Sequence, residues 1–205
     1  MTKHPITALV LLGLLAFAPS VAEAQPHDSD VRLMLETDFF RWIRVKPDDL
    51  DDVNRLLLGP YGPASVWALT SVASAGLGYA ITRDVVINAA FGVAWASNPD
   101  TDGHSLAMRV VPDVDILLKG GRGARPYVTL GVPIAIAKQD WAVGVADLGT
   151  SKSRSAGPQV GLGVMAGPFH AELTFAALFG KGPPNEDRSI RELSVGLSMG
   201  ASLWL

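Results

Sequence analysis

The last thirteen residues of the chain alternate strictly between apolar side chains and small or polar ones. The apolar positions are Leu193, Val195, Leu197, Met199, Ala201, Leu203 and Leu205. The positions between them are Ser194, Gly196, Ser198, Gly200, Ser202 and Trp204. A period of two is typical of a β-strand with one apolar face. The pattern therefore predicts a long C-terminal strand that reaches the final residue.

The same alternation recurs along the chain and predicts eight strands. We expect them over 31–45, 65–81, 85–95, 106–118, 128–136, 160–164, 169–179 and 193–205. Glycine-containing or short polar turns follow the second, fourth and sixth strands. The other connections are longer and polar, over 46–64, 98–104, 138–157 and 180–190. Short turns that alternate with longer connections are typical of an up-and-down barrel. Pro112 and Pro133 interrupt two strands and predict bulges.

The first strand shows how the two faces are assigned. Its apolar face is predicted to carry Val31, Leu33, Leu35, Phe39, Ile43 and Val45. Its opposite face is predicted to carry Arg32, Glu36, Asp38 and Arg44. In the other strands this opposite face is rich in glycine, with serine and alanine between.

The start of the chain has the composition of a secretory signal. Lys3 precedes an apolar run over 6–18, and Ala22-Glu23-Ala24 fits a cleavage site. The run is shorter than the roughly 20 residues that a spanning helix needs. We therefore expect a signal peptide over 1–24, a short periplasmic N-terminal segment over 25–30 and a barrel domain over 31–205. Because a signal peptide would export the chain from the cytoplasm, we expect the barrel to lie in the outer membrane.

A soluble lipocalin-like barrel would have the same number of strands, with its apolar face inside. The glycine-rich face of this chain would make a poor surface against water, but it suits the narrow interior of eight strands. The low charged fraction, 18%, and the 21 glycines fit a barrel that faces lipid. The predicted fold is all-β, an eight-stranded antiparallel up-and-down transmembrane β-barrel. Since the chain has no cysteine, disulfides cannot stabilise it.

Two sets of residues follow from this assignment. Charges predicted to pair inside the barrel are Arg32, Glu36, Asp38, Arg109, Asp113, Asp115, His170 and Glu172. Aromatic residues predicted to form girdles at the two membrane interfaces are Trp67, Tyr79, Trp95, Phe169 and Phe179. The charge cluster is interpreted as the polar core of a filled barrel, with a gate or a solute site as the alternative.

The chain resembles the small OmpA-type and OmpW-like outer-membrane β-barrel domains of Gram-negative bacteria. The resemblance lies in Gly76-Leu77-Gly78-Tyr79, in Arg125-Pro126-Tyr127-Val128 and in the C-terminal strand. It implies recognition of that strand by the barrel-assembly machinery. Members of the group usually end in an aromatic residue, whereas Leu205 ends this chain.

Candidate chemistry is sparse. His170 and Glu172 share a face with Thr174 and offer a base with a carboxylate, although a structural pair is the favoured interpretation. Asp48, Asp49, Asp51 and Asp52 precede Leu56-Leu57-Leu58-Gly59, which predicts a helix that ends at the glycine. These carboxylates, and those of Asp100-Thr101-Asp102-Gly103, lack the spacing of a calcium loop. We expect no metal and no cofactor.

These observations predict a structural or surface-interaction protein rather than an enzyme. A passive channel for small or hydrophobic solutes is the alternative, and a lipid A-modifying enzyme is the third. The expected partners are outer-membrane lipid and lipopolysaccharide, whose phosphates would favour Lys152 and Arg154 beside Trp141. The formal charge of −3 gives no reason to expect nucleic-acid binding, and we expect a monomer.

Overall fold

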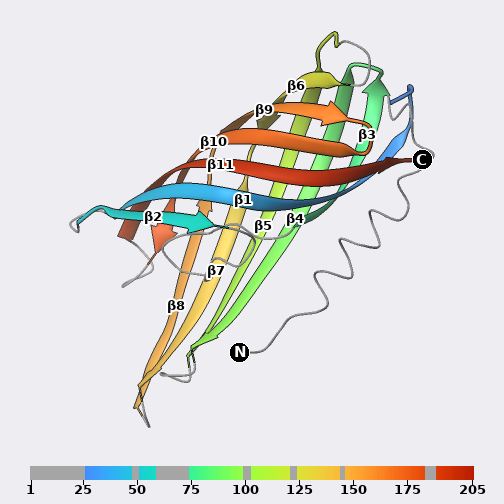
Figure 1. Ribbon diagram of the computed structural model, residues 1–205. Coiled ribbons are helices and arrows are strands. Elements are labelled where there is room, and N and C mark those ends of the chain that lie inside the picture. Colours follow the sequence, from blue (N-terminus) through green and yellow to red (C-terminus); the bar gives the residue numbers. More distant parts are fainter. Residues whose placement is uncertain are drawn as a thin grey trace.

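In the part of the chain that the computed structural model describes, the regular secondary structure consists of β-strands (Figure 1). The described residues are 26–47, 51–58, 74–98, 103–120, 124–143, 146–182 and 188–205. Within these residues no helix is long and apolar enough to cross a membrane. The predicted signal peptide, 1–24, lies outside them.

Eleven strand segments form one antiparallel sheet. They are β1 (Val31–Pro47), β2 (Val53–Leu58), β3 (Ser74–Thr82), β4 (Val85–Asn98), β5 (Gly103–Leu117), β6 (Arg125–Gly131), β7 (Ile134–Val143), β8 (Ala146–Ala156), β9 (Gln159–Ala166), β10 (Phe169–Gly182) and β11 (Arg188–Trp204).

The segments combine into a ring of eight strands. On β5, Asp113 pairs with Gly131 of β6, and Val110, three residues away, pairs with Ile134 of β7. The register is therefore unbroken across Pro133, and β6 and β7 act as one strand. In the same way β9 and β8 act as one strand beside β10. Pairing of β1 with β11 closes the ring, and the all-β eight-stranded prediction is confirmed.

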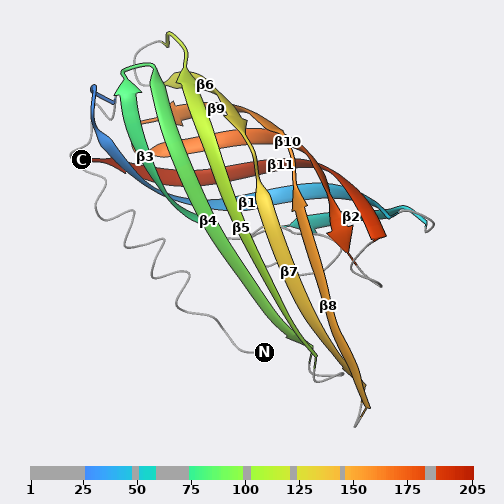
Figure 2. The ribbon, with the colours of Figure 1, turned by 180° about the vertical axis from the view of Figure 1, so that it is seen from behind.

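Short turns and the C-terminus lie at one end of the barrel. The β3–β4 and β9–β10 turns are at this end, and the Leu205 amide donates a 2.9 Å hydrogen bond to the Val31 carbonyl. We refer to it as the turn end. Residues 26–30 lie here too, since the Ala80 amide donates to the Asp30 carbonyl. The long β7–β8 hairpin extends from the opposite end (Figures 1 and 2).

The outer surface of the barrel wall is apolar. Leu77 is 60% exposed and Leu162 is 54% exposed, and outward apolar side chains occur on every strand of the ring. Such a surface would be unfavourable against water but matches the hydrocarbon core of a bilayer. On β4, β5, β9, β10 and β11 the described side chains face outward in the phase that the alternation predicts.

The outer half of β1 corrects the prediction for the first strand. The pairing with β11 slips at Phe39, where Asp38 pairs with Ser198 but Phe40 pairs with Leu197. A bulge adds one residue and reverses the faces of everything after it. Ile43 and Val45, predicted to face outward, are therefore fully buried inside. Arg44, predicted to face inward, lies exposed on the outer surface.

Three further predictions are wrong in detail. The segment 56–59 was predicted to end a helix, but Val53–Leu58 is strand β2, paired with β1. The predicted long loop 138–157 is largely strand, because β7 and β8 continue beyond the bilayer thickness. At the predicted loop 98–104, β4 extends to Asn98 and β5 begins at Gly103, and residues 99–102 lie outside the described part of the chain. Pro112 causes no bulge, since the β4–β5 register runs unbroken past it. Pro133 lies between β6 and β7, but the register with the neighbouring strands continues across it, so the predicted bulge is absent there too.

Glycines make room for the large side chains inside the narrow barrel. A Cβ on Gly163 would overlap the Tyr127 ring, and one on Gly200 would overlap the His170 ring. Likewise a Cβ on Gly161 would overlap the Glu172 carboxylate. Each of these glycines lies on the strand next to the one that carries the large residue, so the large side chain occupies the space beside the glycine. The glycine-rich face is the inner face for this steric reason.

Candidate functional site

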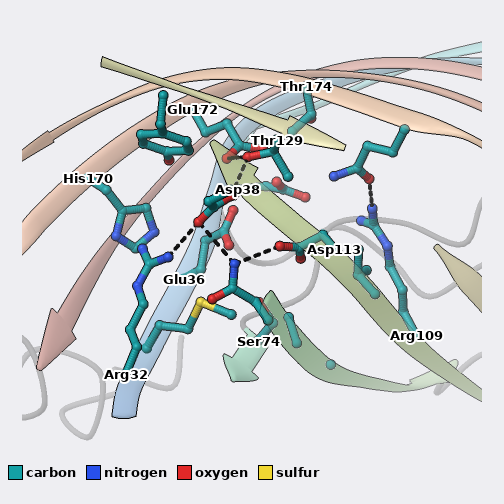
Figure 3. Close-up of a pocket in the computed structure, with 18 of the residues that line it drawn as sticks. Arg32, Glu36, Asp38, Ser74, Arg109, Asp113, Thr129, His170, Glu172 and Thr174 are labelled. Carbon is teal, nitrogen blue, oxygen red and sulfur yellow. Dashed lines mark hydrogen bonds and ion pairs between the residues drawn. The ribbon is translucent and has the colours of Figure 1, made fainter. Parts of the chain in front are cut away.

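The predicted charge cluster lies inside the barrel and lines a single cavity (Figure 3). All eight predicted residues contribute: Arg32, Glu36, Asp38, Arg109, Asp113, Asp115, His170 and Glu172. They come from β1, β5 and β10, on which inward positions recur every second residue. Alternation thus brings together charges that are more than one hundred residues apart in the chain.

Arg32 is the centre of the network nearest the turn end. Its side chain is 2% exposed. Nη1 donates a 2.7 Å hydrogen bond to Asp115 Oδ2, and Nε donates a 2.9 Å bond to Ser202 Oγ. The guanidinium also lies 5.6 Å from the centre of the Trp204 ring, within the range of a cation–π contact. The charge is thereby compensated by the Asp115 carboxylate and by contact with the Trp204 ring.

Two neutral side chains connect the carboxylates around Arg32. Asn88 Nδ2 donates to Asp113 Oδ1 at 2.8 Å and to Asp115 Oδ2 at 3.0 Å. The Thr129 hydroxyl lies 2.7 Å from Asp115 Oδ1 and 2.8 Å from Glu172 Oε2. A hydroxyl carries a single hydrogen, so it donates to one of these carboxyl groups at a time. Asp115 is the residue that all three neighbours share.

A second polar layer lies nearer the opposite end. Arg41 Nε and Nη2 donate to the two oxygens of Asp38 at 2.9 and 3.0 Å. This paired geometry fixes both side chains. Arg109 donates through Nη2 to Gln159 Oε1 at 2.6 Å, so its described partner is an amide and not one of the predicted acids.

Apolar side chains close the turn end beneath the network. Ala80, Val86, Leu117, Tyr127 and Met165 form a buried cluster, against which Trp204 packs. We call this set the turn-end cap. The cavity that remains among the charged residues is about 60 Å³, which is space for a few water molecules. Around the charged residues, the described side chains leave little open volume.

His170 and Glu172 have separate partners in this interior. The His170 Nδ1 atom lies 3.3 Å from Ser202 Oγ, whereas Glu172 contacts Thr129. Among the described side chains no hydrogen bond joins the imidazole to the Glu172 carboxylate. Thr174, the third member of the predicted face, is hydrogen-bonded through its hydroxyl to the Gly196 carbonyl at 3.4 Å. Each of the three side chains therefore supports the packing between strands.

Three predicted girdle residues face outward. Tyr79 and Phe169 lie close to the turn end, and Phe179 lies toward the opposite end. Trp95 occupies β4 opposite Leu106 of β5, but its side chain lies outside the described part of the structure. Trp67 lies outside the described residues altogether.

The acidic connections give no metal site in the part of the chain that is described. No group of three or more His, Cys, Asp or Glu side chains there could hold a metal ion. Asp52 instead pairs with Arg44, and the hydrogen bond from that guanidinium lowers the pKa of the Asp52 carboxyl below its ordinary value. Asp48, Asp49 and the segment 100–102 lie outside the described residues.

Sequence reasoning missed the residues that link the charges. Asn88, Thr129 and Gln159 lie on the polar phase of their strands, so their inward direction could have been read from the alternation. Arg41 could not, because the bulge at Phe39 changes its face. Ser202 shares the inward phase of the C-terminal strand with Trp204.

Comparison of the fold with solved structures finds bacterial outer-membrane barrels. The outer-membrane protease OmpT from Escherichia coli is similar with a TM-score of 0.50 and 8% identity, over 86% of this chain and 97% of that one. Ail, the attachment invasion locus protein of Yersinia pestis, gives 0.48 and 14% identity, over 86% and 99%. Neisserial surface protein A gives 0.43 and 12%, over 83% and 98%. By sequence, no family and no curated protein matches. The chain has the fold of a small outer-membrane β-barrel.

Proposed function

We propose that this chain spans the outer membrane of a Gram-negative bacterium as a closed barrel, with a structural or surface-interaction role and no catalytic activity. The observation that carries the proposal is the filled interior. Two polar layers contain the buried ion pairs Arg32–Asp115 and Arg41–Asp38, and the turn-end cap lies below them. The cavity of about 60 Å³ among these side chains has space for a few water molecules, which supports a closed interior.

The closed interior supports a function in which the barrel contacts partners at its surface, and it argues against transport of solutes through the barrel. Eight strands leave an interior only just wide enough for side chains. Here the side chains of Tyr127, His170 and Glu172 each occupy the space beside a glycine of a neighbouring strand. Opening a pore would break hydrogen bonds to Asp115, whose side chain is buried, and this is costly.

The end opposite the turns supports contact with partners outside the cell. About 9–11 residues of tilted strand cross a bilayer. β1 and β11 each have 17 residues, and β7 and β8 continue the strands that begin at β6 and end at β9. In an outer-membrane barrel the short turns face the periplasm, so these extensions would project from the cell surface.

Planar-bilayer recording tests the closed state. We expect the purified barrel, inserted into a lipid bilayer at low voltage, to give no steady ionic current. Heat-dependent mobility on a denaturing gel would verify that the inserted protein is folded. A steady open pore from folded protein would contradict the proposal and favour a passive channel for small solutes.

A further inference from the structure

Cations gather on the outer surface of five neighbouring strands. Lys46 lies on β1, Arg191 on β11, Lys181 on β10, Arg154 and Lys152 on β8, and Lys138 on β7, and all six side chains are exposed. We call these six residues the basic belt. The described outward side chains of the same strands include no carboxylate. Arg44 also lies on this surface, but it is paired with Asp52.

The members of the basic belt lie at one level of the barrel. Lys46 is fifteen residues from Val31, at the turn end of β1, and Lys181 is twelve residues from Phe169, at the turn end of β10. The other four are likewise twelve to fourteen residues from the turn ends of their strands: Arg191, Arg154, Lys152 and Lys138. Since about 9–11 residues cross the hydrocarbon, all six sit just beyond its outer boundary.

Strand pairing places these like charges directly opposite each other. Lys46 pairs with Arg191, Lys181 pairs with Arg154, and Lys138 pairs with Lys152. Opposed like charges on neighbouring strands are destabilising, because their Cβ atoms are only about 5 Å apart. Lys138 and Lys181 each have a further interaction, so an anion would stabilise this surface chiefly at Lys152 and Arg154. In the described part of the chain neither Lys152 nor Arg154 has an ion-pair partner.

We propose that the basic belt binds the phosphate groups of lipopolysaccharide in the outer leaflet. This inference rests on the proposed outer-membrane location and assigns residues to the contact. The position identifies the ligand, because Phe179 and Ile136 are each two residues nearer the turn end than Lys181 and Lys138 on the same strands, and their outward side chains would contact acyl chains. A molecule bound here therefore presents apolar chains beneath anionic groups. Lysine and arginine supply the donors that bind phosphate.

The test compares two variants that each remove two exposed cations. K152Q/R154Q acts within the basic belt, and R83Q/K119Q acts at the turn end, where both side chains are also exposed. Fluorescent lipopolysaccharide is titrated into the full barrel in zwitterionic micelles. We expect K152Q/R154Q to weaken binding about tenfold or more, since each cation near an anionic lipid surface contributes substantially. R83Q/K119Q should stay within about twofold of the unmodified protein.

Further titrations test whether the phosphate groups are bound and whether they belong to lipopolysaccharide or to another anionic lipid. Dephosphorylated lipopolysaccharide should bind the unmodified protein as weakly as the phosphorylated form binds K152Q/R154Q, and K152R/R154K should retain binding. Equal binding by K152Q/R154Q and the unmodified protein, equal loss in R83Q/K119Q, or equal competition by phosphatidylglycerol would each contradict the inference. Heat-dependent gel mobility verifies folding of every variant. The bilayer recording is independent of this result, so an open pore would overturn the closed barrel without changing the phosphate dependence.

Discussion

Replacing Arg32 by alanine is expected to lower the free energy of unfolding by about 3–5 kcal/mol. The change leaves Asp115 inside the barrel without the guanidinium that donates to it at 2.7 Å. Asn88 and Thr129 would still contact this carboxylate, but neither carries a positive charge. Removing one partner of a buried ion pair costs more than the pair contributes, because an uncompensated charge remains. Urea unfolding in phospholipid vesicles, followed by tryptophan fluorescence, measures the change.

Two controls separate the buried charge from general effects of substitution. R32Q/D115N removes both charges and keeps hydrogen-bonding groups, so it should recover at least half of the loss. Arg83→Gln removes an exposed cation at the β3–β4 turn and should change stability by about 0.5 kcal/mol or less. If Arg32→Ala were as stable as Arg83→Gln, Arg32 would not be the centre of the interior network.

Replacing Tyr127 by alanine should also be costly, by about 3–5 kcal/mol. Tyr127 is 2% exposed and lies in the turn-end cap, with its ring over Gly163. Alanine would leave a cavity that the strands cannot close, because the barrel register fixes their spacing. The same urea titration in vesicles measures this loss.

Tyr79→Ala is the matched control for the Tyr127 prediction. Tyr79 is the same residue type at the same end of the barrel, but it faces outward and is 49% exposed. Lipid can fill the space that its ring leaves, so we expect less than half of the Tyr127→Ala effect. Tyr127→Phe keeps the ring and should retain most of the stability. Equal losses from Tyr79→Ala and Tyr127→Ala would show that the turn-end cap contributes no special packing.

Most of the barrel could be predicted because the alternation of apolar and polar residues assigns each residue of a strand to the inner or the outer face. On β10 and β11, knowing the face of one residue assigns every other residue, and this places His170 and Glu172 inside. The same reasoning places Arg32 and Asp115 on inner faces, but it gives no register between strands. The contact between these two side chains therefore needed the structure.

The errors occur where the pattern of the chain does not determine how neighbouring strands pair. A single extra residue at Phe39 reverses Ile43, Arg44 and Val45, and nothing in the apolar pattern marks it. The leucines of β2 fit a helix as well as a strand at this length, and pairing with β1 decides between them. At Pro112 the proline predicts a bulge, but the register between β4 and β5 is unchanged.

Site-directed spin labelling along β11 tests most directly which face of the barrel meets lipid. The chain has no cysteine, so single cysteines can be introduced at each position from 193 to 202 without background labelling. In phospholipid vesicles we expect collision with oxygen, which concentrates in lipid, to peak at Leu193, Val195, Leu197 and Met199. Labels at Ser194 and Ser198 should be shielded from it. Peaks at the serine positions, or no period of two, would contradict an apolar face turned to lipid around a filled polar interior.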